Sequence, residues 1–332
     1  MSELIQISGG SDRAIVFVHG RSFKPAARDY LDILISALTA GIECDRPDTL
    51  DAFVDTTKIL AYYGDLSSEF LSNKGEEYDE MLDVADLLNA LHELKTIDRV
   101  KGFGVSRYDR LPGKSAYREF AISMFAPIAA SLGFGKKLVS GRQPDLGEYW
   151  RRDSALRAAV IDRVRDTIAA ALDRFEHVIV IAHGTGSIVA FDALWQLSHA
   201  EEHAESCNGL KVDVWLTLGT PLGDSMVRRE LLGGGLKGRQ RFPTNVVAWH
   251  NVAAEDDYVC YDNTVADDFR AMLKQRQISS IRDYRIYNMT VRYGRSNPHN
   301  VLGYLVHPRA AKIVADWIGG IRGRPLPRAR AD

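Results

Sequence analysis

Three positions, each close behind an expected strand, hold the residues of this sequence that could carry chemistry. Gly184 lies in the tight turn 183–186, Asp257 follows the strand-like stretch 246–252, and His299 follows the last one. A histidine can remove a proton from a nucleophile, and a carboxylate beside it fixes the histidine tautomer. In chain order, the sequence therefore offers a nucleophile position, an acid and a base, with a glycine at the nucleophile position.

Strand-like and helix-like segments alternate around these positions. Continuous apolar runs such as 14–18 and 177–182 are typical of strands that are buried on both faces. The alternation predicts an α/β fold, with a mostly parallel central sheet flanked by helices. The expected strands are 14–18, 58–63, 177–182, 212–218, 246–252 and 284–293, and the expected helices are 77–95, 153–174, 187–197 and 301–318.

Residues 99–150 interrupt the alternation. Two glycine-rich stretches there flank an apolar segment at 117–132. We interpret 99–150 as a helical, lid-like insertion within one domain of residues 1–320, and a lid of this kind could make peripheral contact with a lipid surface. The alternative is a packed helical excursion. Residues 321–332 are basic and are expected to form a mobile tail.

Composition narrows the class of protein. The chain has 332 residues, 45% of them hydrophobic, and a net charge of −2, which argues against a disordered chain and against a nucleic-acid partner held by bulk charge. No apolar run approaches the ~20 residues that span a bilayer, and the first residues lack the pattern of a signal peptide. The three cysteines are far apart and predict no disulfide framework. We expect a cytoplasmic protein that needs no metal or organic cofactor.

Two other motifs are weaker. The turn 184–186 begins a dinucleotide-binding pattern, but its third glycine would fall at Val189, and no P-loop lysine follows. His199, Glu202 and His203 match an inverted zinc-protease motif. Because they lie in a very polar stretch past a helix, we interpret them as a solvated surface segment.

Six short motifs occur in an order that covers nearly the whole chain. They are Val18-His19-Gly20, Tyr63-Gly64-Asp65, Ala182 to Ser187, Thr217 to Leu222, Trp249-His250-Asn251, and Pro298-His299 to Gly303-Tyr304. Together they resemble the α/β-hydrolase superfamily, in particular bacterial lipases and esterases. That family carries a nucleophilic serine in a small-x-Ser-x-Gly elbow, and this sequence has Gly184 there.

The resemblance implies hydrolysis of carboxylic esters through an acyl-enzyme. The spacing from Trp249 assigns the acid to Asp257, with Asp256 as the first alternative and Asp262 as the second. The backbone N–H groups of Arg21 and Thr185 are expected to form the oxyanion hole. The neighbours expected to contact a small-molecule ester or lipid substrate are His19, Gly20, Ser22 and His183.

Gly184 leaves three explanations open. The nucleophile of an elbow has a positive φ angle, which glycine adopts without steric cost. The chain is an engineered knockout, a natural pseudo-hydrolase that binds a lipid, ester or protein partner without cutting it, or an enzyme in which His299 activates water directly. As written, it lacks a serine nucleophile and is expected to be inactive or very weak as an esterase.

Overall fold

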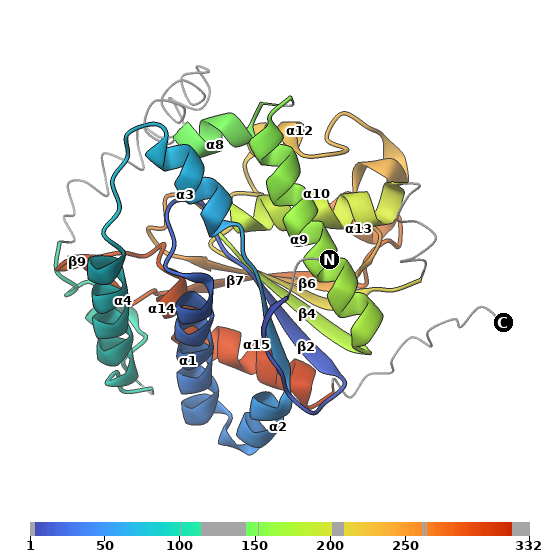
Figure 1. The fold of residues 1–332 in the computed structure, drawn as a ribbon. Helices are drawn as coiled ribbons and strands as arrows, with labels where there is room; N and C mark the ends of the chain where they lie inside the picture. Colours follow the sequence, from blue (N-terminus) through green and yellow to red (C-terminus); the bar gives the residue numbers. More distant parts are fainter. Residues whose placement is uncertain are drawn as a thin grey trace.

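A seven-stranded sheet forms the middle layer of the structure (Figure 1). The structure is a computed structural model that describes residues 4–99, 101–113, 144–151, 153–200, 209–260, 262 and 264–320. The strands are β1 (Ile5–Ile7), β2 (Arg13–Val18), β3 (Thr57–Ala61), β4 (His177–His183), β5 (Val212–Leu218), β6 (Val246–Ala254) and β7 (Ser280–Ile286). Their order is β1-β3-β2-β4-β5-β6-β7, and only β1 runs antiparallel to its neighbour. The predicted α/β class and mostly parallel sheet are confirmed.

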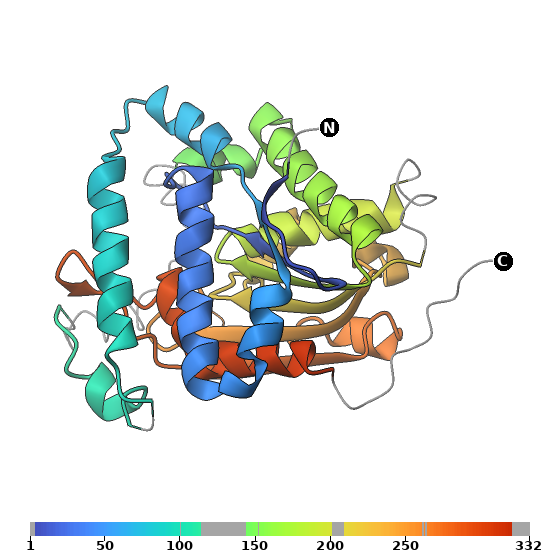
Figure 2. The same cartoon turned by 60° about the horizontal axis from the view of Figure 1, so that its bottom comes forward.

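Helices cover both faces of this sheet (Figures 1 and 2). Because side chains alternate along a strand, Ile15 and Phe17 of β2 join one apolar core, and Val16 joins the other. The first core is closed by α1 (Ala27–Asp45), α4 (Glu80–Lys95), α14 (Val301–Val306) and α15 (Pro308–Ile318). The second is closed mainly by α9 (Ala155–Arg174) and α10 (Gly186–His199).

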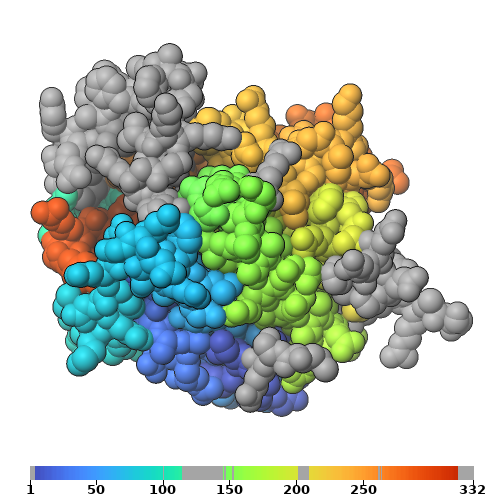
Figure 3. Space-filling view, turned by 45° about the horizontal axis from the view of Figure 1, so that its top comes forward, coloured from blue at the N-terminus to red at the C-terminus, as the bar shows by residue number. Residues whose placement is uncertain are grey.

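Shorter elements complete the described chain. α3 packs against α8 and α9, and these segments lie side by side in the space-filling view (Figure 3). The bounds of the shorter helices are α2 (Leu50–Asp55), α3 (Gly64–Ser72), α5 (Val105–Tyr108), α8 (Pro144–Tyr149), α12 (Ser225–Glu230) and α13 (Arg270–Lys274), with 3₁₀ turns at Pro47–Thr49 and Gly238–Arg241.

Two predicted elements were wrong in their extent. The strand expected at 284–293 begins at Ser280 and ends at Ile286, and β8 (Val291–Arg292) instead pairs with β9 (Arg295–Ser296) in a separate hairpin. Beyond the strand, the buried amide of Asn288 donates to the backbone carbonyls of Pro298 and Asn300 at 2.9 and 2.8 Å and so ties the chain to the loop before α14. The chain leaves the sheet after Ile286.

The helix expected at 301–318 is two helices. Pro308 disfavours helical backbone at the residue before it, and His307 has a ψ of 138°. The His307 ring then caps α15, because its Nδ1 accepts from the N–H of Arg309 at 3.0 Å.

The apolar segment 117–132 and the tail 321–332 lie outside the described residues, so the lid and the mobile tail stay predictions. Of the interrupting region, the structure describes α5 and α8. Among the helices that are described, none combines the length and the apolar character needed to cross a membrane.

A buried ion pair joins the helices beside the sheet. The carboxylate of Asp192 in α10 accepts from Arg157 of α9 and from the Tyr149 hydroxyl of α8, both at 2.9 Å. Its other oxygen accepts from the N–H of Leu232 at 2.7 Å. Burial raises the pKa of Asp192, and the neighbouring Arg157 acts against that rise. Asp192 therefore connects α8, α9 and α10. Loss of either charge would leave the other one buried without a partner.

We expect Arg157→Ala to lower the free energy of unfolding by about 3–5 kcal/mol, because it leaves the Asp192 carboxylate buried without a cation. Urea denaturation at pH 7 measures the change. Arg163→Ala is the matched control, since Arg163 pairs with Asp65 at the surface, and it should cost less than about 1 kcal/mol. Equal losses in the two variants would contradict the assigned role of the buried pair.

Candidate active site

The turn between β4 and α10 is too crowded for most side chains. A Cβ at Gly186 would lie 2.1 Å from the carbonyl oxygen of His19, so only glycine fits there. Gly184 has a φ angle of +55°, and its N–H donates to the carbonyl of Leu218 on the neighbouring strand at 2.9 Å. The turn thus has the tight, positive-φ geometry that the sequence predicted, and it fixes position 184 at the end of the sheet.

Asp257 and His299 are in direct contact. Nδ1 of His299 lies 3.0 and 2.9 Å from the two carboxylate oxygens of Asp257. The Asp257 side chain is fully buried, whereas that of His299 is one-third exposed. Asp257 follows β6, and His299 precedes α14, so two segments 42 residues apart supply the pair.

Three further groups hold the carboxylate. Oδ2 of Asp257 accepts from the Tyr304 hydroxyl at 2.6 Å and from the Cys260 thiol at 3.2 Å, and Oδ1 accepts from the N–H of Val259 at 3.0 Å. Burial alone would raise the pKa of Asp257, but the charge and hydrogen bond of His299, with those of Tyr304 and Cys260, hold it below its ordinary value. Asp257 is therefore an anion that can fix the tautomer of His299.

Space for this pair depends on Gly219. Its φ is +60°, and a Cβ there would lie 2.8 Å from Asp257 Oδ2 and 3.2 Å from His299 Nδ1. Sequence reasoning gave no role to Gly219 or Tyr304, although both belong to the motifs of the resemblance. The signal that could have found Gly219 is a glycine directly behind a buried strand.

The other ring nitrogen of His299 is directed at position 184. A Cβ on Gly184 would lie 2.9 Å from His299 Nε2 and 3.1 Å from Cε1. The imidazole is thus placed to exchange a proton with a side chain at 184, once the ring shifts by a few tenths of an ångström to admit that Cβ.

The two alternative acids have other partners. The Asp256 carboxylate accepts from the Tyr108 hydroxyl at 3.1 Å, and Asp256 itself has a φ of +60°. The Asp262 carboxylate accepts from the hydroxyl of Thr264 at 2.8 Å. The structure therefore brings Asp257 to His299, whereas Asp256 bonds to Tyr108 of α5 and Asp262 bonds within its own loop.

The two residues expected to form the oxyanion hole are in contact. The N–H of Arg21 donates to the Thr185 hydroxyl at 2.9 Å, so in this conformation a protein oxygen occupies that donor. Asp145 of α8 holds the same loop, accepting from the Arg21 guanidinium at 2.8 Å and from the N–H of Ser22 at 2.9 Å. Sequence reasoning missed Asp145, because nothing local marks a carboxylate whose partner lies 124 residues away.

His19 has a structural role. Its Nδ1 donates to the carbonyl of Gly20 at 2.7 Å, and its Nε2 accepts from the N–H of Tyr63 at 3.0 Å. Burial, reinforced by the charge of Lys24, lowers the pKa of His19 to about 3. The ring is 98% buried and is not part of the cavity wall described below.

His183 supports the catalytic candidate His299 from behind. Its Nε2 donates to the backbone carbonyl of His299 at 2.7 Å, and the two rings lie 4.6 Å apart. Burial, followed by the charge of His299, lowers the pKa of His183 to about 3. His183 therefore stays neutral and fixes the loop that carries His299.

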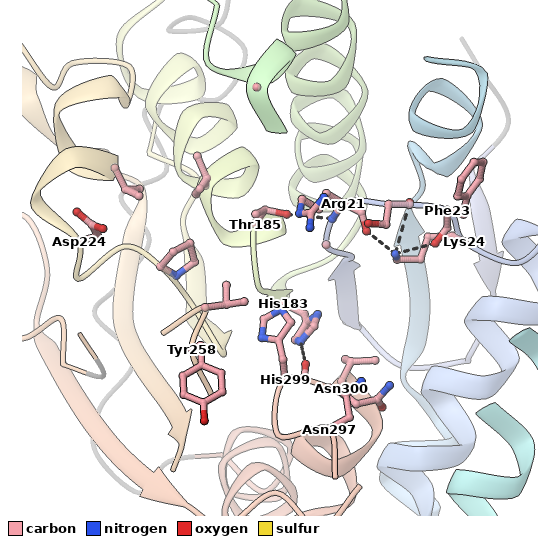
Figure 4. Close-up of a pocket in the computed structure, with 18 of the residues that line it drawn as sticks. Arg21, Phe23, Lys24, His183, Thr185, Asp224, Tyr258, Asn297, His299 and Asn300 are labelled. Carbon is pink, nitrogen blue, oxygen red and sulfur yellow. Dashed lines mark hydrogen bonds between the residues drawn. The ribbon is translucent and has the colours of Figure 1, made fainter. Parts of the chain in front are cut away.

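A cavity of roughly 720 Å³ opens beside these groups (Figure 4). His299, His183 and Thr185 line it, together with the loop of Gly20, Arg21 and Ser22. A volume of this size accommodates a medium-sized organic ligand. The predicted substrate neighbours Gly20, Ser22 and His183 therefore line it, and His19 does not.

Over the described ranges, no group of three or more His, Cys, Asp or Glu side chains is arranged to hold a metal ion. His199, from the zinc-protease motif, donates to the carbonyl of Phe242 at 2.9 Å. Glu202 and His203 lie outside the described residues.

Comparison with known proteins identifies no family for this chain. No family model matches this chain, no curated protein is significantly similar to it, and no solved structure matches it significantly. The functional assignment therefore rests on the geometry of the site.

We expect His19 and His183 to remain neutral down to about pH 4, since burial lowers both pKa values to about 3. A histidine in the unfolded chain binds a proton near pH 6.5 and these two do not, so stability falls as the pH drops below 6.5. Each contributes a slope of up to about 1.4 kcal/mol per pH unit.

The histidine ring signals in NMR spectra between pH 7 and 4, with urea denaturation at the same pH values, test this. Titration of either ring near pH 6.5 in the folded protein would contradict the assigned burial.

Proposed function

We propose that this chain has the α/β-hydrolase fold and that its cavity binds a carboxylic ester beside the Asp257–His299 pair. The pair is that of a serine-type esterase whose nucleophile position is held by Gly184. The observation that carries the proposal is the placement of His299: Nδ1 contacts Asp257, and Nε2 faces the Cβ position of residue 184.

The topology supports this proposal. The turn at Gly184 follows β4, the acid follows β6, and the histidine follows β7. Nucleophile, acid and histidine occur in that chain order in α/β-hydrolases, with the nucleophile on a sharp strand-to-helix turn. The positive φ of +55° at residue 184 is the backbone geometry that such a turn imposes.

With serine at 184, the residues present would carry each step. His299 Nε2 removes the proton from the serine hydroxyl, whose oxygen attacks the ester carbonyl carbon. The tetrahedral oxyanion is stabilised by the N–H of Thr185, at the start of α10, and by that of Arg21 once the Thr185 hydroxyl turns away. His299 then protonates the departing alcohol, and water attacks the acyl-enzyme by the same route.

A second candidate is a pseudo-hydrolase that binds a lipid, an ester or a protein partner without cutting it. Two observations favour it: Gly184 supplies no nucleophile, and the Arg21 N–H is occupied by the Thr185 hydroxyl in the structure. In that case the cavity and the fixed histidine are a recognition site.

We expect Gly184→Ser to hydrolyse p-nitrophenyl esters at least about 10³-fold faster than the native chain, because only the variant can form an acyl-enzyme. Gly184→Ala is the matched control. It introduces the same Cβ against His299 and the same strain of about 1–2 kcal/mol at a positive φ, but no hydroxyl. Release of p-nitrophenol by the three proteins, over short and long acyl chains, gives the result.

Adding His299→Ala to the serine variant should abolish the gained activity. Equal activity with and without His299 would show that the pair is wrongly assigned. Folded serine and alanine variants that are both as inactive as the native chain would favour the pseudo-hydrolase.

A further inference from the structure

The cavity has two chemically different sides. Figure 4 places His183 and His299 in the middle, Phe23 and Lys24 on one side, and Asp224 with Tyr258 on the other. Tyr30, Asp83 and Arg292 also line the cavity and interact electrostatically with one another or with Lys24. We call Lys24, Tyr30, Asp83 and Arg292 the polar side.

Tyr30 offers a hydrogen-bond donor on this side. The residue is 96% buried and lines the cavity, yet its hydroxyl forms no hydrogen bond with any residue in the described part of the chain. The hydroxyl oxygen is not fully buried, so a ligand in the cavity can reach it. Its ring is fixed edge-on against His19 at 6.0 Å, and burial raises the pKa of the phenol, so the hydroxyl remains a donor.

Arg292 offers a second donor that is held in place. Its Nε donates to Asp86, and its Nη2 donates to Asp83 at 2.6 Å. The side chain is only 9% exposed, and within the described residues Nη1 has no acceptor. Two carboxylates thus orient a guanidinium that belongs to the cavity wall and whose third nitrogen bonds to no residue in the described part of the chain.

The charges on the polar side, counted together with the Asp86 carboxylate that pairs with Arg292, cancel. Lys24 and Arg292 are balanced by Asp83 and Asp86, and the Lys24 ammonium already donates to the carbonyls of Arg21 and Phe23. A full anion would therefore lose its hydration for little Coulomb gain, and a cation would meet the guanidinium. An uncharged group with oxygen acceptors suits these donors best.

Besides Asp224 and Tyr258, the other part of the cavity has an apolar wall. Ile188 of α10, Met226 and Val227 of α12, and Val259 behind the acid line it. A hydrocarbon chain gains about 0.8 kcal/mol for each CH₂ that it buries against such a wall. This side therefore suits an acyl chain, with its carbonyl near His299.

We infer that the cavity takes an amphipathic ester: an acyl chain lies against Ile188 and Met226, and an uncharged, oxygen-rich alcohol part accepts hydrogen bonds from Tyr30 and Arg292. A partially acylated polyol has this chemistry. The inference rests on the proposed ester site and adds the class of alcohol that the site selects.

Binding to the native chain tests the inference without catalysis. Isothermal titration calorimetry with 1-octanoylglycerol, propyl octanoate, octanoylcholine and 1-octanoylglycerol 3-phosphate, below their micellar concentrations, compares a polyol, no polar group, a cation and an anion. We expect 1-octanoylglycerol to bind at least 5-fold more tightly than each of the others. Tyr30→Phe should weaken its binding about 2- to 12-fold and leave propyl octanoate unchanged.

Tyr284→Phe is the matched control, because it removes a phenol hydroxyl that bonds to His250 on β6, outside the cavity wall. Propyl octanoate or the phosphate ester binding as tightly as 1-octanoylglycerol to the native chain would overturn the inference and leave the ester site standing. An unchanged affinity for 1-octanoylglycerol in Tyr30→Phe would also overturn it. Failure of all four esters to bind would overturn the ester site itself.

Discussion

The close approach of two strand ends is the constraint on which the site depends. The turn after β4 packs so tightly on the chain after β2 that Gly186 faces the His19 carbonyl with no room for a side chain. His19 is itself fixed by Gly20 and Tyr63. This contact sets position 184 and the start of α10 beside the Arg21 loop. A larger residue at 186 would separate the groups that must meet around a ligand.

Glycines serve the site in different physical ways. Gly186 allows contact between two backbones, whereas Gly219 leaves room for Asp257 and His299. Gly184 relieves backbone strain, and its missing side chain lets the His299 ring lie 2.9 Å from the point where a Cβ would stand. A buried carboxylate held by Tyr304 and Cys260 then keeps the histidine oriented although residue 184 has no side chain.

Local patterns predicted much of the fold. The runs at 14–18 and 212–218 became β2 and β5 within one residue, because buried parallel strands are continuous and apolar. The break at Pro308 has a local cause that helical periodicity at 301–318 concealed. The three-residue β1 and the helix α1 were not predicted at all.

The sequence predicted those site residues that belong to short motifs at tight turns. The positive φ of Gly184 and the preference for Asp257 over Asp256 followed from short motifs, and the structure places Asp257 against His299. Tyr30 and Asp145 could not be found in this way, because their roles arise from residues far away in the chain. The esterase function itself stays a prediction.

The glycine at position 184 also decides how this protein can be observed. Fluorophosphonates and similar reagents reveal hydrolases by forming a covalent bond with a serine oxygen, and this turn presents no such atom. Surveys that rely on covalent capture would therefore pass over the chain whether or not its cavity is filled. Conversely, an ester that enters the cavity meets no attacking side chain at position 184, so crystals of the native protein could hold it whole.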